Sequence, residues 1–237
     1  MTKPFKFKQF TVQQNRCAMK IGTDGVLLGA WASVAHHPFN VLDIGAGTGI
    51  LSLMIAQRSD ANQIEAIEID DDAFEQCAEN FENSPWNDRL FCFHASLLEY
   101  IEAVDEKFDL IICNPPFYSE DYKTKDTSRN LARFSDAMPL EHIVFAVINF
   151  LSDKGKFSII IPYKEEETVI EEVSLIDLFP NRILRVRGHK NSEIKRSLIE
   201  FSYTESTVQI SELIIETERH NYTEDYMNLT KDFYLKM

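Results

Sequence analysis

The segment VLDIGAGTGILSL, residues 41–53, decides the fold. It begins with an apolar run typical of a buried strand and ends with apolar side chains at helical spacing. Gly45, Gly47 and Gly49 lie between the two. Glycine has no β-carbon, so the chain can turn sharply there and approach a ligand closely. The free N–H groups at the start of the following helix suit a polar ligand.

Predicted strands and helices alternate outward from this segment. The alternation predicts a parallel, doubly wound α/β sheet, and a late pair of strands predicts an antiparallel hairpin at its edge. We expect Thr23 or Asp24 to cap the first helix and Gly155 to end the fourth. The predicted strands are residues 39–44, 64–70, 89–96, 108–113, 156–162, 182–188 and 197–203, and the predicted helices are residues 23–35, 48–58, 71–84, 139–155 and 165–179.

An acidic residue stands near the end of the second predicted strand. This residue is Glu68, in the sequence AIEID. A carboxylate at the tip of this strand can accept hydrogen bonds from both hydroxyls of a ribose. Asp70 points the same way in an extended strand, whereas Asp71 and Asp72 favour the first turn of the next helix.

The fourth predicted strand runs directly into Asn114-Pro115-Pro116-Phe117. Two prolines often do no more than end a strand. The same residues also resemble motif IV of amino-methyltransferases, which implies that they bind an exocyclic amine, whose two N–H groups need two acceptors. The side-chain carbonyl of Asn114 and the backbone carbonyl of Pro115 would supply them, and Phe117 would stack on the base. The prolines would preset that geometry.

The composition describes an acidic protein with local basic clusters. The 237 residues carry a net charge of −14, which disfavours general nucleic-acid binding. The four cysteines have no CxxC spacing, so buried thiols in a reducing cytoplasm are expected, without a metal. No secretory leader or membrane span is predicted. The basic clusters are Lys3, Lys6, Lys8, Arg16 and Lys20; Lys123, Lys125, Arg129 and Arg133; and Arg182, Arg185, Arg187, Lys190, Lys195 and Arg196.

The glycine segment resembles motif I of class I methyltransferases. Its GxGxG spacing, led by Asp43, differs from the GxGxxG of nicotinamide oxidoreductases. The resemblance implies S-adenosylmethionine as cofactor, a Rossmann-like sheet of seven strands, and Asp43 near the methionine amino group. Its spacing favours Glu68 over Asp70 for the ribose. Ser96 stands where the family usually has an Asp that binds the cofactor adenine.

Further segments resemble the bacterial tRNA1(Val) (adenine(37)-N6)-methyltransferases over essentially the full length. The resemblance implies transfer to the N6 amine of an adenine beside a tRNA anticodon, in one domain of residues 1–237 with an arm and capping helix at 1–35 and a catalytic core at 36–237. Thr23, Asp24 and Gly25 would close over the cofactor. Lys20 would contact cofactor or RNA, and Arg129, Arg133 and Arg196 would contact RNA. The matching segments are residues 5–32, NPPFY at 114–118, SPW at 84–86 and residues 221–237.

Other functions remain open on the sequence. The Asn-Pro-Pro-Phe motif also suits a methyltransferase acting on an adenine of rRNA or DNA, or on a protein glutamine, because all present a planar amine. A protein that binds the cofactor without catalysis is disfavoured by the intact Asn114 and Phe117. The oligomeric state is left open, with a monomer plausible. The aromatic residues of the tail, such as Tyr226 and Phe233, are expected to pack rather than to stack on RNA.

Overall fold

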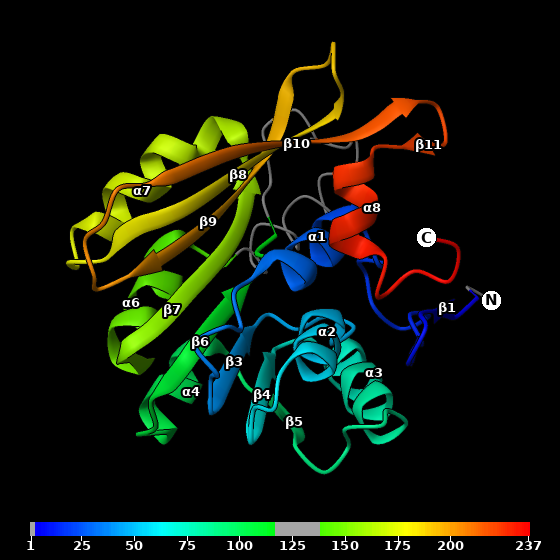
Figure 1. Cartoon of the computed structure of the whole chain (residues 1–237). Coiled ribbons are helices and arrows are strands. Elements are labelled where there is room, and N and C mark those ends of the chain that lie inside the picture. Colours follow the sequence, from blue (N-terminus) through cyan, green and yellow to red (C-terminus); the bar gives the residue numbers. More distant parts are fainter. Residues whose placement is uncertain (1–2, 117–137) are drawn as a thin grey trace, which may run out of the picture.

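A computed structural model describes residues 3–116 and 138–237 of the chain. They form a nine-stranded sheet with helices on both faces (Figure 1). The strand order is β11-β10-β8-β9-β7-β6-β3-β4-β5. The strands are β3 (Asn40–Ile44), β4 (Gln63–Glu68), β5 (Leu90–His94), β6 (Phe108–Cys113), β7 (Leu151–Pro162), β8 (Phe179–His189), β9 (Ile194–Ser202), β10 (Gln209–Glu218) and β11 (Asn221–Tyr222).

The strand directions confirm the predicted α/β class. Strands β3 to β7 pair in parallel, and β9 runs antiparallel between β7 and β8. The seven expected strands are therefore present, with the hairpin at their edge. Two further strands extend the sheet, because β10 pairs in parallel with β8 and β11 pairs with β10. Most residues of β10 are exposed, so its sequence lacks a strong apolar pattern.

Two apolar cores lie on opposite faces of the sheet. Consecutive strand residues point to opposite faces, so Ile112 belongs to one core and Ile111 to the other. The first core is covered by α1 (Thr23–Trp31), α2 (Ile50–Arg58), α3 (Asp71–Glu82) and α8 (Glu224–Thr230). The second is covered by α4 (Leu97–Ala103), α6 (Leu140–Phe150) and α7 (Glu166–Ser174).

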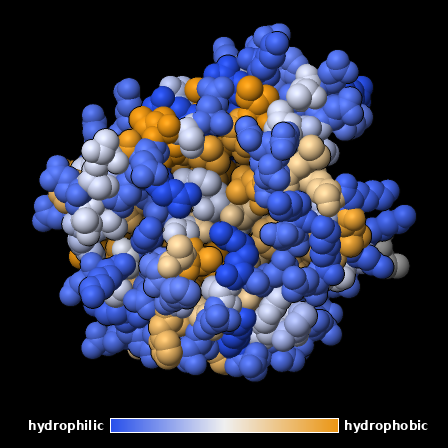
Figure 2. Space-filling view, in the orientation of Figure 1, coloured by the Kyte–Doolittle hydropathy of each residue, from blue (hydrophilic) through white to orange (hydrophobic). Residues whose placement is uncertain are grey.

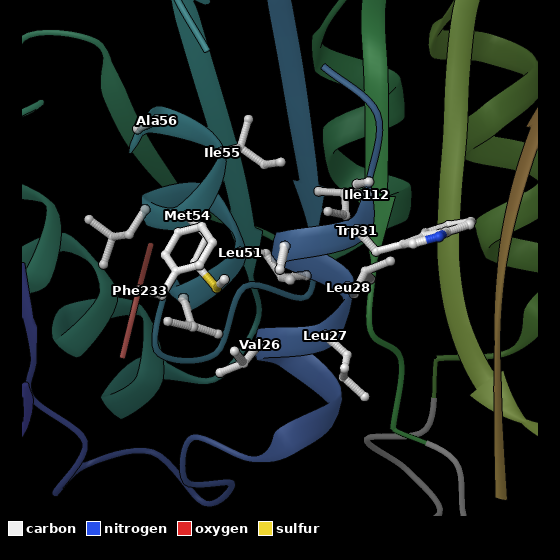
Figure 3. Close-up of a cluster of buried hydrophobic side chains, with 14 of the residues drawn as sticks. Val26, Leu27, Leu28, Trp31, Leu51, Met54, Ile55, Ala56, Ile112 and Phe233 are labelled. Atoms are coloured by element: carbon white, nitrogen blue, oxygen red, sulfur yellow. The ribbon is translucent and has the colours of Figure 1, made fainter. Parts of the chain in front are cut away.

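Helices α1 and α2 pack closely in the first core. A β-carbon at Gly29 would lie 2.7 Å from the sulfur of Met54, so the glycine lets the helices approach. Figure 3 shows Met54 and Leu51 of α2 beside Leu28 and Val26 of α1. Phe233 of the C-terminal segment joins this cluster and is only 2% exposed. These contacts anchor α1, which carries the Thr-Asp-Gly sequence, to α2, the helix that follows the loop of Gly45, Gly47 and Gly49.

The N-terminal arm packs against the C-terminal segment. The arm contains β1 (Phe5–Lys6) and β2 (Thr11–Val12), which pair antiparallel. Phe7 bridges to Tyr234, and the amide of Lys8 donates to the carbonyl of Phe233 at 2.8 Å. The expectation that the aromatic tail packs is confirmed for Tyr226 and Phe233, which are buried.

Two predicted helix ends are wrong. Helix α6 ends at Phe150, and Gly155 lies buried inside β7, where a β-carbon would come within 2.9 Å of the Phe108 carbonyl. The glycine is needed there because β7 crowds β6 at a register shift. Helix α1 starts after Gly22 and has no side-chain cap, so neither Thr23 nor Asp24 acts as one.

The surface agrees with the charged composition. Figure 2 shows hydrophilic residues over most of the viewed face, with smaller patches of hydrophobic residues between them. Within residues 3–116 and 138–237, no helix is long and apolar enough to cross a membrane.

Candidate functional site

The loop between β3 and α2 turns through three residues with positive φ. Gly45, Gly47 and Gly49 have φ of 74°, 55° and 76°. The amides of Gly45 and Ala46 both donate to the carbonyl of Ile67 in β4 at 3.0 Å, which fixes the loop over the neighbouring strand. Residues with a β-carbon are strained at such φ values, so the turn itself requires the glycines.

The glycines differ in their surroundings. A β-carbon at Gly49 would lie 2.5 Å from Phe81 Cε1 and 2.8 Å from Cys77 Sγ, so this glycine lets α3 pack against the loop. A β-carbon at Gly47 would meet no atom within 4 Å. The loop is therefore tightly packed at Gly49 and open at Gly47, where a ligand can reach the backbone.

Asp43 lies fully buried on β3, just before the loop. Its Oδ2 accepts hydrogen bonds from the Ser52 amide at 3.1 Å and the Ser52 hydroxyl at 2.7 Å. Its Oδ1 has no hydrogen-bond partner among the described residues. Burial raises the pKa of Asp43 to about 7, although the bonds from Ser52 lower it. A buried acceptor without a partner is what a polar ligand group or a water would satisfy.

Glu68 ends β4 beside the loop. Its Oε2 accepts from the Gly47 amide at 2.7 Å, and its Oε1 accepts from the amides of Ile69 and Asp70 at 2.9 and 3.0 Å. The carboxylate is thus held in place and keeps lone pairs for a ligand. The side chain of Asp70 instead caps α3, accepting from the Ala73 amide at 2.8 Å. This arrangement favours Glu68 over Asp70 as the ribose acceptor.

Ser96 has a structural role at the end of β5. It is the N-cap of α4, and its hydroxyl accepts from the Glu99 amide at 3.2 Å. The Glu99 carboxylate completes a capping box by accepting from the Ser96 amide. The nearby His94 stacks on Phe74 with 5.0 Å between ring centroids. The local sequence Ser-Leu-Leu-Glu could have indicated this cap, so a contact between Ser96 and the cofactor stays a prediction.

Asn114 lies next to the glycine loop. Ile44 of β3 pairs with Cys113 of β6, so Gly45 and Asn114 leave adjacent strands about 5 Å apart. The Asn114 Nδ2 atom lies 3.9 Å from the position of a β-carbon at Gly25. The predicted Thr-Asp-Gly segment thus lies close to the predicted catalytic motif. Phe117, Arg129 and Arg133 lie outside the described residues.

Similar proteins agree on one family. The family model described as "Methyltransferase small domain" matches residues 27–166. The tRNA1(Val) (adenine(37)-N6)-methyltransferase of Flavobacterium johnsoniae is 59% identical over 98% of this chain and 100% of its own. That of Christiangramia forsetii is 57% identical over 99% of this chain and 98% of its own. The chain belongs to the tRNA1(Val) (adenine(37)-N6)-methyltransferase family.

Solved structures place this methyltransferase in the same fold class. A predicted O-methyltransferase from Agrobacterium tumefaciens matches with a TM-score of 0.64 and 19% identity, covering 89% of this chain and 96% of its own. A precorrin-6y C5,15-methyltransferase from Geobacter metallireducens matches with a TM-score of 0.54 and 13% identity, covering 82% and 93%. At this identity the likeness concerns the fold alone, which is that of class I methyltransferases.

The cofactor of this methyltransferase is S-adenosylmethionine. The loop fits it, because the open space at Gly47, the unpartnered oxygen of Asp43 and the fixed carboxylate of Glu68 lie at the ends of β3 and β4. In the described part of the chain, no group of three or more His, Cys, Asp or Glu side chains could hold a metal ion.

The predicted arm residues of this methyltransferase have partners within the protein. Lys20 donates to the carbonyls of Gln14 and Cys17 at 2.7 and 2.6 Å. Arg16 forms ion pairs with Glu75 and Glu79 of α3. Arg16 therefore holds the arm against α3, whereas Lys20 stabilises a turn within the arm. The side chain of Arg16 is 34% exposed.

Several arginines of the third basic cluster form ion pairs within the protein. Arg182 contacts Glu200 at 3.4 Å, Arg185 contacts Glu166 at 2.6 Å and Arg187 contacts Glu212 at 2.7 Å. Arg196, expected to contact RNA, pairs with Asp24, which was expected to contact the cofactor. Sequence analysis missed these acids because they lie far from their partners along the chain. Glu200 sits within an apolar strand, a context that could have indicated a buried pair.

Proposed function

We propose that this methyltransferase transfers a methyl group from S-adenosylmethionine to the N6 amine of adenine 37 in a valine tRNA. The relatives described above carry that activity in their names at up to 59% identity over nearly the whole chain. One observation carries the proposal, namely the pairing of Ile44 with Cys113, which brings the glycine loop and Asn114 to neighbouring positions at one edge of the sheet.

The chain's own residues position the acceptor. The cofactor supplies an activated methyl group, so no covalent enzyme intermediate is required. The side-chain carbonyl of Asn114 and the backbone carbonyl of Pro115 accept the two N–H groups of the adenine amine, which aims its lone pair at the methyl group. Pro115 is buried, so its backbone is held rigid. Phe117 stacks on the base after it has left the anticodon loop stack.

The surrounding residues complete the proposal. Gly45, Gly47 and Gly49 admit the cofactor, Asp43 faces its amino group, Glu68 accepts its ribose hydroxyls and Ser96 faces its adenine. Thr23, Asp24 and Gly25 close over it through α1. Lys20, Arg129 and Arg133 contact the tRNA backbone near the anticodon. The protein acts in the cytoplasm, where tRNA is modified.

Methylation of defined RNA tests the function. Purified protein, S-adenosylmethionine and unmodified tRNA1(Val) are incubated, and the nucleosides are analysed for N6-methyladenosine. We expect the product at position 37 and none in a tRNA whose adenine 37 is replaced by guanine. An rRNA fragment, a DNA duplex and a glutamine peptide serve as alternative acceptors. Methylation of one of them with the tRNA left unmodified would contradict the proposal.

A further inference from the structure

Tyr163 is an exposed aromatic residue at the end of the sheet where the parallel strands finish, which is also the end that carries Asn114. It starts the short helix η2 (Tyr163–Glu165) directly after Pro162, the last residue of β7. Because Ile159 of β7 pairs with Cys113, the last residue of the parallel strand β6, the residues after both strands leave the sheet at the same end. Neighbouring strands lie about 5 Å apart, and Tyr163 follows β7 as Asn114 follows β6, so the backbone of Tyr163 lies close to the catalytic motif. It remains 38% exposed.

An arginine fixes this ring from β8. The Cζ atom of Arg185 lies 5.5 Å from the ring centroid of Tyr163. Arg185 donates to Oε1 of Glu166 from Nε at 3.1 Å and from the terminal nitrogen at 2.6 Å. Glu166 is nearly buried and also accepts from the Ser197 hydroxyl. Groups from η2, α7, β8 and β9 therefore hold the Tyr163–Arg185 pair in one arrangement, which lowers the entropic cost of binding to it.

Two exposed lysines lie near the pair along the chain. Lys164 follows Tyr163, and Lys195 stands two residues before Ser197, which pairs with Arg185 across β8 and β9. Their side chains are 57% and 66% exposed, and their acidic partners Glu165 and Glu193 are exposed too. Exposed ion pairs contribute little, so these lysines keep most of their attraction for other anions. An aromatic ring among cations matches a single-stranded nucleic acid, since bases stack on rings and phosphates attract lysine. This edge thus offers an acidic protein a local place to bind RNA.

We propose that Tyr163, backed by Arg185, stacks on an unpaired base that neighbours the methylated adenine in the tRNA. The inference rests on the proposed function, since it takes the substrate to be a tRNA loop. When the target adenine leaves the loop stack, the base beside it loses a stacking partner. A preset ring next to the catalytic motif replaces that partner and keeps the loop open.

Fluorescence of a labelled RNA tests the stacking. Anticodon stem-loops carry 2-aminopurine, whose fluorescence falls on stacking, on either side of adenine 37, and are titrated with protein and S-adenosylhomocysteine. We expect quenching at one of the two positions with the unchanged protein and with Y163F. We expect Y163A to lose the quenching and to bind unmodified tRNA about 5- to 100-fold more weakly, with unchanged affinity for S-adenosylhomocysteine.

A matched control separates stacking from a general loss of surface. Tyr222 is also 38% exposed but lies in β11, so Y222A should leave tRNA affinity unchanged. Melting temperatures of all variants show whether they fold. If Y163A binds tRNA as tightly as Y222A, or if Y163F loses as much affinity as Y163A, the stacking proposal is overturned. If instead the unchanged protein binds tRNA and quenches the label through Tyr163 but yields no N6-methyladenosine, the proposed function fails while the stacking by Tyr163 is supported.

Discussion

Asp24 of α1 and Arg196 of β9 form an ion pair, with Oδ2 of the aspartate 2.8 Å from Nε of the arginine. Arg196 pairs in the sheet with Pro162 at the end of β7, so the ion pair ties α1 to the catalytic edge. The next residue, Gly25, lies close to Asn114, whose Nδ2 is 3.9 Å from where a β-carbon of Gly25 would stand. The pair therefore holds the N-terminal helix beside Asn114, which we propose binds the acceptor.

Charge reversal tests this link. D24R or R196D alone should weaken binding of S-adenosylhomocysteine about 2- to 10-fold, because like charges push α1 from the edge. The double variant D24R/R196D should recover affinity to within about twofold. Calorimetry measures all three.

A second ion pair provides the control for charge reversal. Glu212 binds Arg187 at 2.7 Å on the neighbouring strands, away from α1. E212R should leave cofactor affinity unchanged. If the double variant D24R/R196D binds no better than the single ones, the pair does not position α1.

Replacing Asn114 should separate catalysis from cofactor binding. N114A removes one acceptor of the adenine amine, so we expect kcat to fall by about 100- to 1000-fold. Affinity for S-adenosylhomocysteine should change less than about threefold. N114D keeps an acceptor oxygen and should retain more activity than N114A. Single-turnover methylation of tRNA with saturating protein gives the rates, and an N114A variant of undiminished rate would refute the role.

Substitutions at Gly49 and Gly47 should have different effects on stability and on cofactor binding. G49A should lower the free energy of unfolding by about 2–4 kcal/mol, because it combines a positive φ with contact to Phe81. G47A should cost about 1 kcal/mol of stability but weaken cofactor binding markedly, because its methyl group enters the open space. Urea unfolding and calorimetry measure the two effects.

Gly188 supplies the reference for both substitutions. A β-carbon there meets no atom within 4 Å and its φ is not positive, so G188A should change stability by less than about 0.5 kcal/mol. Equal effects of G47A and G49A on both measurements would contradict the distinction.

The buried Asp43 should make stability depend on pH. Its pKa is about 7 in the folded protein and about 4 in an unfolded chain, so the folded state binds the extra proton between these values. Its contribution to stability is therefore complete below about pH 4 and is lost as pH rises through 7. D43N stays neutral, so the unchanged protein should lose stability relative to D43N between pH 5 and pH 8. Urea unfolding at four pH values measures the difference, and a constant difference would exclude the raised pKa.

Local patterns predicted the strands and helices that form the site. The Asp43 strand, its glycines and Glu68 follow one another within 26 residues, so their spacing reports their geometry directly. The end of β6 just before Asn114 could be predicted too, because a continuous apolar run precedes it.

Long-range partners could not be predicted in this way. Asp24 and Arg196 are 172 residues apart, and their pairing depends on β9 lying between β7 and β8. Gly155 was assigned to a helix end because glycine favours that position, whereas crowding of β7 against β6 explains it. The sequence indicated the secondary structure that each residue favours, but not which distant residue it contacts in the folded chain.

The bridge between Phe7 and Tyr234 has a consequence for synthesis in the cell. The sheet from β3 to β7 can pair once residue 162 has left the ribosome, whereas the arm must wait for residues 231–237, which receive its hydrogen bonds. The N-terminal arm is thus synthesised first but reaches its folded position among the last parts of the chain. A nascent chain could therefore have a paired sheet from β3 to β7 while its N-terminal arm still lacks its partner segment.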